Sequence, residues 1–237
     1  MLNKTYGQLC PIARSLDILG ERWTLLVVRE LLLGPKRFKE LLAVLPAMGT
    51  NRMSARLKVL VENGIVQSTP APNATYELTT FGEQLRAPLL ALGIWGLNLP
   101  VDVRIDPSST RAELIALSLT GINTSGTRND ISAVCEFHVD DEVFHMRVKG
   151  GEATTHSGQA SQSDAIVQCD PETFMALALQ QISPHDAMQQ GRVYIKSGQA
   201  RIFEQLFEAL QYSPEKYPFP LLNTPSHSSL AGTPDES

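Results

Sequence analysis

The chain has few of the features that mark secreted, membrane-spanning or disordered proteins. Its three cysteines, Cys10, Cys135 and Cys169, are odd in number and far apart, so we predict neither a disulfide framework nor a zinc site. No stretch approaches the roughly 20 apolar residues of a membrane span, and the polar N-terminus lacks a signal-peptide pattern. We therefore expect a cytoplasmic protein. Charged residues make up 19% and apolar residues 43%, which favours folded domains with real cores over wholesale disorder.

Sequence motifs of enzymes are also missing. We find no glycine-rich phosphate loop, no paired-carboxylate motif and no nucleophile elbow. His138 and His145 fall on neighbouring predicted strands and could approach each other, but exposed strand positions explain them without a metal. We accordingly predict a protein that is not an enzyme, with no catalytic residues, metal or cofactor.

Positive charge is scarce in the second half of the chain. Residues 1–100 carry 11 Lys and Arg against 7 Asp and Glu, a net charge of +4, whereas residues 101–237 carry 9 against 18, a net charge of −9. Phosphate binding needs cations on one face. The first half is therefore the candidate for nucleic-acid binding, and two functions on two domains is the simplest interpretation.

Residues 50–64 form the predicted helix around which the first half is organised. Thr50 suits an N-cap and Gly64 a helix end. Met53, Leu57, Leu60 and Val61 make one narrow apolar stripe, and the opposite face is polar and rich in hydrogen-bond donors. An ordinary amphipathic surface helix would show the same stripe. The segment after residue 64 therefore decides between a plain surface helix and a helix that contacts DNA.

Two short predicted strands, residues 65–69 and 75–79, come directly after this helix around a Pro-rich turn, which gives the outline of a winged helix-turn-helix. Helices are predicted over residues 10–20, 22–33, 36–42 and 83–97, and the last of these favours a dimer interface. The second helix of such a motif enters the major groove. The predicted DNA contacts are Lys36, Arg37, Lys39, Thr50, Asn51, Arg52, Ser54, Ala55, Arg56, Lys58, Ser68 and Asn73.

Several motifs in this half carry a family resemblance. Cys10-Pro11, Gly20-Glu21-Arg22-Trp23-Thr24, Arg37-Phe38-Lys39-Glu40-Leu41, Glu62-Asn63-Gly64-Ile65-Val66 and Tyr76-x-Leu78-Thr79-x-x-Gly82 stand in the order and spacing of the HxlR-type winged-helix regulators. The chain resembles that family over about residues 8–98, which implies a dimeric bacterial transcription factor. The turn between the two strands departs from the pattern because residues 70–74 contain no Arg or Lys, which argues against minor-groove insertion by a basic side chain.

Cys10 has two interpretations. In some members of the resembled family, the cysteine before the first helix is a redox or electrophile sensor, and a helix N-terminus favours the thiolate. The alternative is a small, half-buried residue with no such role.

The second half is predicted to be an α+β domain with a five-stranded sheet. We expect a first domain over 1–99, a linker over 100–108, the second domain over 109–212 and a disordered tail over 213–237. Strands are predicted over residues 131–139, 144–149, 153–156, 165–169 and 192–196, as a meandering sheet with helices on one side. Asp170-Pro171-Glu172 predicts a helix start.

The run Asp170 to Phe174 and the segment Ser183 to Gly198 are similar to the sterol carrier protein 2 family, over about residues 110–211. That resemblance implies a hydrophobic ligand between sheet and helices. The side chains predicted to contact it are Leu114, Phe137, Phe144, Met146, Phe174, Leu177, Met188, Phe203 and Phe207. The competing interpretation is that they simply fill a small core.

We therefore expect a regulator that binds double-stranded DNA as a homodimer and responds to a hydrophobic or lipid-like small molecule, without spanning a membrane. Two alternatives stay open. One is a lipid-binding carrier whose winged helix mediates protein interaction, and the other is a regulator that senses redox state through Cys10.

Overall fold

The computed structural model describes residues 5–70, 74–96, 99, 111–122 and 131–210. The predicted linker over 100–108, the predicted tail over 213–237 and the candidate DNA contact Asn73 lie outside the described residues.

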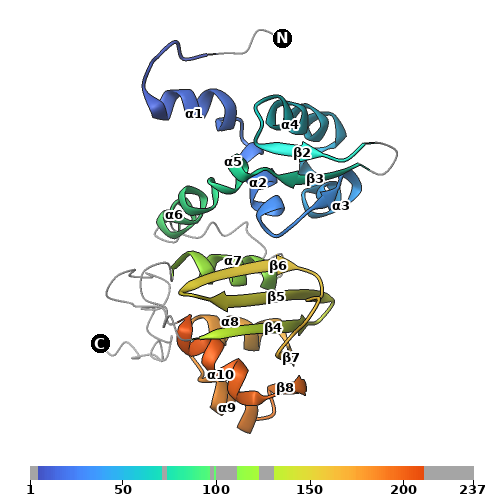
Figure 1. Cartoon of the computed structure of the whole chain (residues 1–237), viewed down its shortest axis with the longest axis vertical. Coiled ribbons are helices and arrows are strands. Elements are labelled where there is room, and N and C mark those ends of the chain that lie inside the picture. The colour runs from blue at the N-terminus through green and yellow to red at the C-terminus, as the bar shows by residue number, and fades with distance from the viewer. Residues whose placement is uncertain (1–4, 71–73, 97–98, 100–110, 123–130, 211–237) are drawn as a thin grey trace, which may run out of the picture.

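The first half is a winged helix-turn-helix, as expected (Figure 1). Its elements are α1 (Pro11–Leu19), α2 (Thr24–Leu32), β1 (Lys36–Arg37), α3 (Phe38–Val44), the 3-10 turn Pro46–Met48, α4 (Thr50–Glu62), β2 (Val66–Ser68), β3 (Thr75–Leu78), α5 (Thr80–Glu83) and α6 (Arg86–Gly96). The three strands form an antiparallel sheet in the order β1-β3-β2.

The N-cap of helix α4 lies one residue earlier than we predicted. Gly49, with φ of 74°, holds the N-cap position and Thr50 is already the first helical residue. A positive φ is adopted by glycine without steric cost, so the turn selects Gly49 over threonine there. Met53, Leu57 and Leu60 are fully buried as predicted, but Val61 is 39% exposed and lies outside the stripe.

The second half forms the predicted five-stranded sheet covered by helices (Figure 1). Its elements are α7 (Ala112–Ile122), β4 (Ser132–Val139), β5 (Glu142–Lys149), β6 (Glu152–Ser157), β7 (Ala165–Cys169), α8 (Pro171–Ala178), α9 (Pro184–Gln189), β8 (Val193–Gly198) and α10 (Ala200–Ala209). The predicted start of α8 is confirmed, since the Asp170 carboxylate accepts a hydrogen bond from the Thr173 backbone N–H at 2.7 Å.

The sheet is not the simple meander that we predicted. Its order is β6-β5-β4-β7-β8, so β7 crosses to the far side of β4 and pairs with it in parallel. Local hydrophobic alternation identifies strands but does not determine which neighbours they pair with. The alternation does set the buried face: Ala133, Cys135, Phe137 and Val139 of β4 all point into the core beneath the helices.

Helix α7 is shared between the cores of the two halves. Ala116 and Leu119 belong to the core of the second half, while Leu117 belongs to the core of the first. The helix also packs closely on α6, because a Cβ added to Gly121 would lie 2.6 Å from the Leu90 Cβ. The helix that follows the predicted domain boundary at residue 109 therefore packs against both halves.

A polar network joins the halves beside α7. The fully buried carboxylate of Glu30 accepts hydrogen bonds from Arg29 at 2.6 Å and from Arg111 at 2.7 Å. The backbone N–H of Ser157, at the end of the edge strand β6, donates to the Leu33 carbonyl at 2.7 Å. The buried charge of Glu30 is thus paired across the junction, which is the condition for burying it without a large cost.

Candidate DNA-binding face and ligand pocket

The outer face of α4 presents the side chains that we assigned to DNA. Asn51, Arg52, Ser54, Ala55 and Lys58 are exposed, as is Thr50, and Arg56 is partly exposed. The buried stripe of the same helix fixes this orientation. Lys58 Nζ lies 3.7 Å from Glu62 Oε1. This ion pair is exposed and screened by water, so the ammonium group stays available to DNA. Figure 1 places α4 on the side of the first half that faces away from the five-stranded sheet.

Arg37, Lys39 and Ser68 are also exposed, around the N-terminus of α3 and on the strand β2. The Glu40 side chain accepts a hydrogen bond from the Arg37 backbone N–H at 2.6 Å, which caps α3. The guanidinium group of Arg37 and the ammonium group of Lys39 are therefore displayed beside a well-fixed helix start.

Lys36 is not available to DNA, and our prediction for it was wrong. It is 8% exposed, and its ammonium group donates to the Ser157 hydroxyl of the second half at 2.9 Å. Residues 36 and 37 form a short strand instead of a helix start, so neighbouring side chains point to opposite faces. Burial lowers the pKa of Lys36, and the nearby carboxylate of Glu113 opposes that shift.

Cys10 stands at the N-terminal end of α1 and is exposed. Cys135 and Cys169 are buried in the second half, where burial raises the pKa of each thiol to about 12. High pKa values make those two thiols unreactive. Cys10 is thus the reactive candidate among the three.

Most of the predicted ligand contacts form a closed aromatic core instead. Phe137 stacks on Phe144 at a ring distance of 5.4 Å and meets Phe174 edge-on at 5.4 Å. These three rings and that of Phe203 are fully buried, and Met146 is 1% exposed. The space between the centre of the sheet and the helices is therefore filled by side chains, which corrects the ligand assignment of those five residues.

Two further predicted contacts lie elsewhere. Leu114 packs against the core of the first half, because it sits on the face of α7 that points that way. Met188 is partly buried and packs against the core of the second half. It is not among the residues that line the cavity described next. Sequence periodicity places these residues on an apolar face without showing which core receives it.

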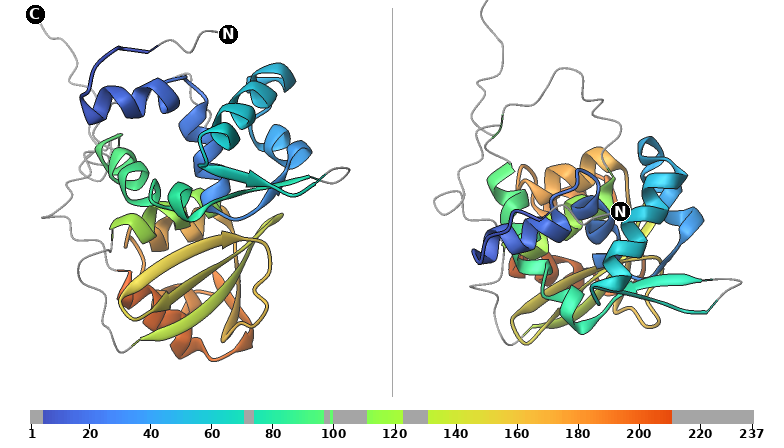
Figure 2. Two further views of the ribbon diagram at one scale, coloured as in Figure 1. Left: turned by 45° about the horizontal axis from the view of Figure 1, so that its top comes forward. Right: turned by 90° about the horizontal axis from the view of Figure 1, so that it is seen from above.

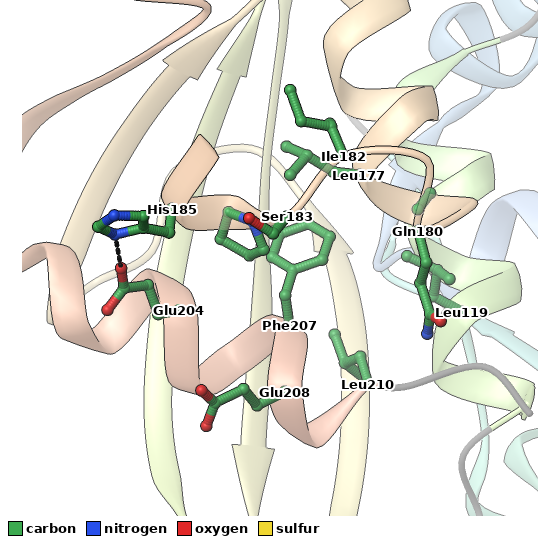
Figure 3. Close-up of a pocket in the computed structure, with 12 residues that line it drawn as sticks. Leu119, Leu177, Gln180, Ile182, Ser183, His185, Glu204, Phe207, Glu208 and Leu210 are labelled. Carbon is green, nitrogen blue, oxygen red and sulfur yellow. Dashed lines mark ion pairs between the residues drawn. The ribbon is translucent and has the colours of Figure 1, made fainter. Parts of the chain in front are cut away.

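A cavity of about 470 Å³ does open at the edge of the second half, between α10, the α8–α9 connection and the end of α7 (Figure 3). Leu177 and Phe207, two of the residues predicted to contact a ligand, line it. The residues that sequence reasoning missed are Leu119, Ala178, Gln180, Ile182, Ser183, Pro184, His185, Glu204, Glu208 and Leu210. Several lie in the connection before α9, whose course no periodic pattern reveals.

The polar side of this cavity is acidic. His185 Nδ1 lies 3.4 Å from Glu204 Oε1, and Glu208 follows one helical turn later on α10 (Figure 3). The apolar side is formed by Leu177, Phe207 and their neighbours. Such a site fits a molecule with an apolar body and a polar group that donates hydrogen bonds.

The histidines of the sheet are held by near neighbours. His138 Nε2 lies 2.7 Å from Glu136 Oε1, and the ring of His145 stacks on that of His156 at 5.5 Å instead of meeting His138. Among the described residues, no group of three His, Cys, Asp or Glu is placed to hold a metal ion. None of the described helices combines the length and the apolar character of a membrane span.

Comparison with protein families gives two matches. Residues 18–100 match the HxlR-like helix-turn-helix model, and residues 116–210 match the SCP-2 sterol transfer family model. The two matches fall on the winged helix and on the five-stranded half, so the sterol carrier resemblance of the second half is confirmed along with that of the first.

Known relatives match the first half. The HTH-type transcriptional regulator YodB of Bacillus subtilis is 35% identical over 92 residues, covering 37% of this chain and 82% of YodB. An HTH-type transcriptional regulator of Synechocystis is 34% identical over 90 residues, covering 36% of this chain and 67% of that protein. A third, from Mycobacterium bovis, is 37% identical, and the chain spans 56% of its length.

Two solved structures are similar over the same region. The quinone-bound YodB of B. subtilis is 33% identical, with 38% of this chain and 100% of that chain covered and a TM-score of 0.36. The oxidised form of the redox regulator HypR is 28% identical, with coverage of 39% and 100% and a TM-score of 0.38. On the first family model and these relatives together, the chain belongs to the HxlR-like helix-turn-helix family of HTH-type transcriptional regulators.

Proposed function

We propose that this protein is a transcriptional regulator that binds a pseudo-palindromic operator as a homodimer and responds to an apolar ligand in its second half. The observation that carries the proposal is the α4 face, where Asn51, Arg52 and Lys58 are exposed on a helix whose opposite side is fully buried. Two such helices would enter successive major grooves about 34–36 Å apart. Arg37 and Lys39 would bind phosphates at the start of α3.

The dimer is supported by apolar side chains left on one side of the first half. Leu9 and Ile12 at α1 are 94% and 71% exposed, and Trp95 on α6 is 61% exposed. Figure 2 shows α1 and α6 on the same side of the winged helix. Exposed apolar patches of this kind mark contact surfaces. We assign residues 1–99 to DNA binding and dimerisation and residues 109–212 to ligand binding, with α7 serving both cores.

The ligand proposal uses the cavity of Figure 3. An apolar molecule lying against Leu177 and Phe207 would touch α8, α10 and the end of α7 at once. Because α7 also packs on α6, a ligand that binds one arrangement of these helices better than another would shift DNA affinity. Native mass spectrometry of the purified protein tests for a bound apolar molecule. Replacement of Ile182, a partly exposed residue of the cavity lining, by glutamate should weaken that binding while leaving the α4 face intact.

DNA binding is tested by two substitutions, measured by fluorescence anisotropy on genomic fragments at several salt concentrations. Arg52→Ala should weaken operator binding by about 1–3 kcal/mol and relax the preference at one base, because a bidentate base contact is lost. Lys39→Ala should weaken all sequences alike and lower the salt slope by about one. Lys196→Ala, an exposed cation of the second half, is the control. A carrier protein whose winged helix binds another protein would show no operator preference in the unmodified chain.

A sensing role of Cys10 is the second candidate, supported by the exposure of Cys10 beside the apolar residues of α1. Oxidation or alkylation there would change the surface that we assign to the dimer. Treatment with an electrophile should then lower operator affinity in the unmodified protein and leave Cys10→Ser unaffected. An equal response of both proteins would exclude the thiol as the sensor.

A further inference from the structure

A second cavity, of about 550 Å³, lies between the two halves and is separate from the cavity of Figure 3. Helices α2 and α6 of the first half and α7 of the second form its walls. Trp23 and Leu26 line it from α2 and its N-cap, Leu89 from α6, and Leu114 and Leu117 from α7. We call this space the junction cavity. Its volume is in the range of small-molecule sites.

The junction cavity is an unfilled space beside a closed core. Val27, Val28 and Leu31, on the inner side of α2, are at most 2% exposed. By contrast, Leu25, Leu26, Leu89, Leu90 and Leu114, which line the cavity, are all partly exposed. The apolar surface that they leave open is available to an apolar ligand, whose burial is favourable roughly in proportion to the area covered.

The charged side chains that line the junction cavity are both arginines, Arg22 and Arg29. The Arg22 guanidinium lies over the Trp23 ring, 5.7 Å from its centre, so an aromatic wall and a cation stand together. Arg29 is held by the buried Glu30, but Glu30 is shared with Arg111, so one carboxylate serves two guanidinium groups. A carboxylate or sulfonate at the cavity edge would meet donors suited to bidentate binding.

We infer that the junction cavity is a binding site for a small organic anion with an apolar body, such as a medium-chain or aromatic carboxylate. The cavity of Figure 3 has the opposite charge at its edge, from Glu204 and Glu208. Bound in the junction cavity, the anion contacts α2 and α6 of the first half and α7 of the second at the same time. It therefore occupies the place through which the two halves contact each other.

Trp23 gives a direct readout of occupancy. The chain has two tryptophans, so in a Trp95→Phe background the fluorescence of Trp23 is observed alone. Bromine quenches tryptophan on contact, so 11-bromoundecanoate is the probe. We expect saturable quenching of Trp23 in the full chain, with affinity at least about tenfold higher than for the cationic analogue 11-bromoundecyltrimethylammonium, a difference of about 1.4 kcal/mol.

Two glycines of α6 provide a matched pair of variants. Gly93 lines the junction cavity and Gly96 does not, and a Cβ added at either meets no atom within 4 Å. Gly93→Leu should place an apolar side chain in the cavity and weaken quenching by the bromoalkanoate. Gly96→Leu should leave the quenching unchanged. Both substitutions raise helix propensity, so neither should unfold the protein. Circular dichroism checks that both fold.

Arg22→Gln tests the charge. It should bring the affinities for the anionic and cationic probes to within about threefold of each other, since Arg22 accounts for much of the preference. Equal quenching by both probes in the parent protein, or unchanged quenching in Gly93→Leu, would overturn the proposal. So would complete protection of Trp23 in the dimer, which would show that a second copy of the chain covers the cavity. None of these measurements involves DNA, so they stand apart from the test of operator binding.

Discussion

The two halves of the molecule treat their large apolar side chains in opposite ways. In the second half, Phe137, Phe144, Phe174 and Phe203 are fully buried and contact one another. In the first half, Leu9, Ile12 and Trp95 are each more than 60% exposed. Of the ten large apolar residues that are exposed in the described part of the chain, nine precede residue 100. The comparison teaches that the second half completes its own core, whereas the first half has a surface suited to a further partner.

The largest change in stability is expected from a substitution in the closed aromatic core of the second half. Phe174→Ala should lower the free energy of unfolding by about 3–5 kcal/mol, because it leaves a cavity among rings that have no space to collapse. Urea denaturation followed by circular dichroism measures it. Tyr194→Ala, at an exposed strand position (62% exposed), should change stability by less than about 0.5 kcal/mol. A loss for Phe174→Ala as small as that of the control would show that the core is loosely packed.

Next in size is a break in the polar network that joins the halves. Glu30→Gln should cost about 3 kcal/mol, because two guanidinium groups lose one buried carboxylate. Glu62→Gln removes an exposed partner of Lys58 and should cost less than about 1 kcal/mol. The same denaturation measurement applies. An equal loss of unfolding free energy in the two variants would mean that water screens the ion pairs of Glu30 between the halves.

A smaller effect is expected on the exposed side of the first half. Ile12→Glu should weaken self-association by about 2 kcal/mol, roughly thirtyfold in the dissociation constant, by placing a charge in the proposed dimer contact. Sedimentation velocity over a range of concentrations measures it. Phe81→Glu changes a residue of α5 that is 58% exposed and should have no such effect. A dimer that Ile12→Glu leaves intact would place the interface elsewhere.

The smallest effect concerns His156, at the edge of the second half beside the first. Burial lowers the pKa of His156 below 6.5, and His145, Arg86 and Arg147 add to that shift while Glu83 opposes it. The unfolded chain therefore takes up a proton at a higher pH than the folded chain does. Stability should be complete above about pH 6.5 and fall as the pH is lowered from there towards the folded pKa. His156→Gln should flatten this acid slope in urea denaturation series, whereas His185→Gln, at an exposed position, should not.

Much of the first half was predictable because its signals are local. The buried stripe of Met53, Leu57 and Leu60 has a helical period, and the two strands after it are bounded by turn residues. That pattern fixes which face of α4 is displayed to solvent. Lys36 was misassigned because a two-residue strand has no periodic signal, and a lysine pairs with a serine 121 residues away only through the fold.

The cavities were less predictable than the elements that surround them. Alternation shows that Phe137 and Phe144 point inwards, but whether inward side chains meet or leave space depends on how helices pack across the sheet. Leu177 and Phe207 line an actual cavity, whereas Phe174, on the same helix as Leu177, lies in solid core. Leu114 and Leu117 face the first half because α7 serves two cores. No pattern within residues 109–119 distinguishes these outcomes.

The sharing of α7 has a consequence for how the molecule unfolds. A helix whose Ala116 belongs to one core and whose Leu117 belongs to the other cannot leave either core without disturbing both. The melting of the two halves is then one cooperative event, and a calorimetric scan should show a single peak instead of two. Severing the chain before α7 would remove a packing surface from Leu89 and Leu90, so we expect an isolated winged helix to expose apolar side chains that α7 covers in the whole chain.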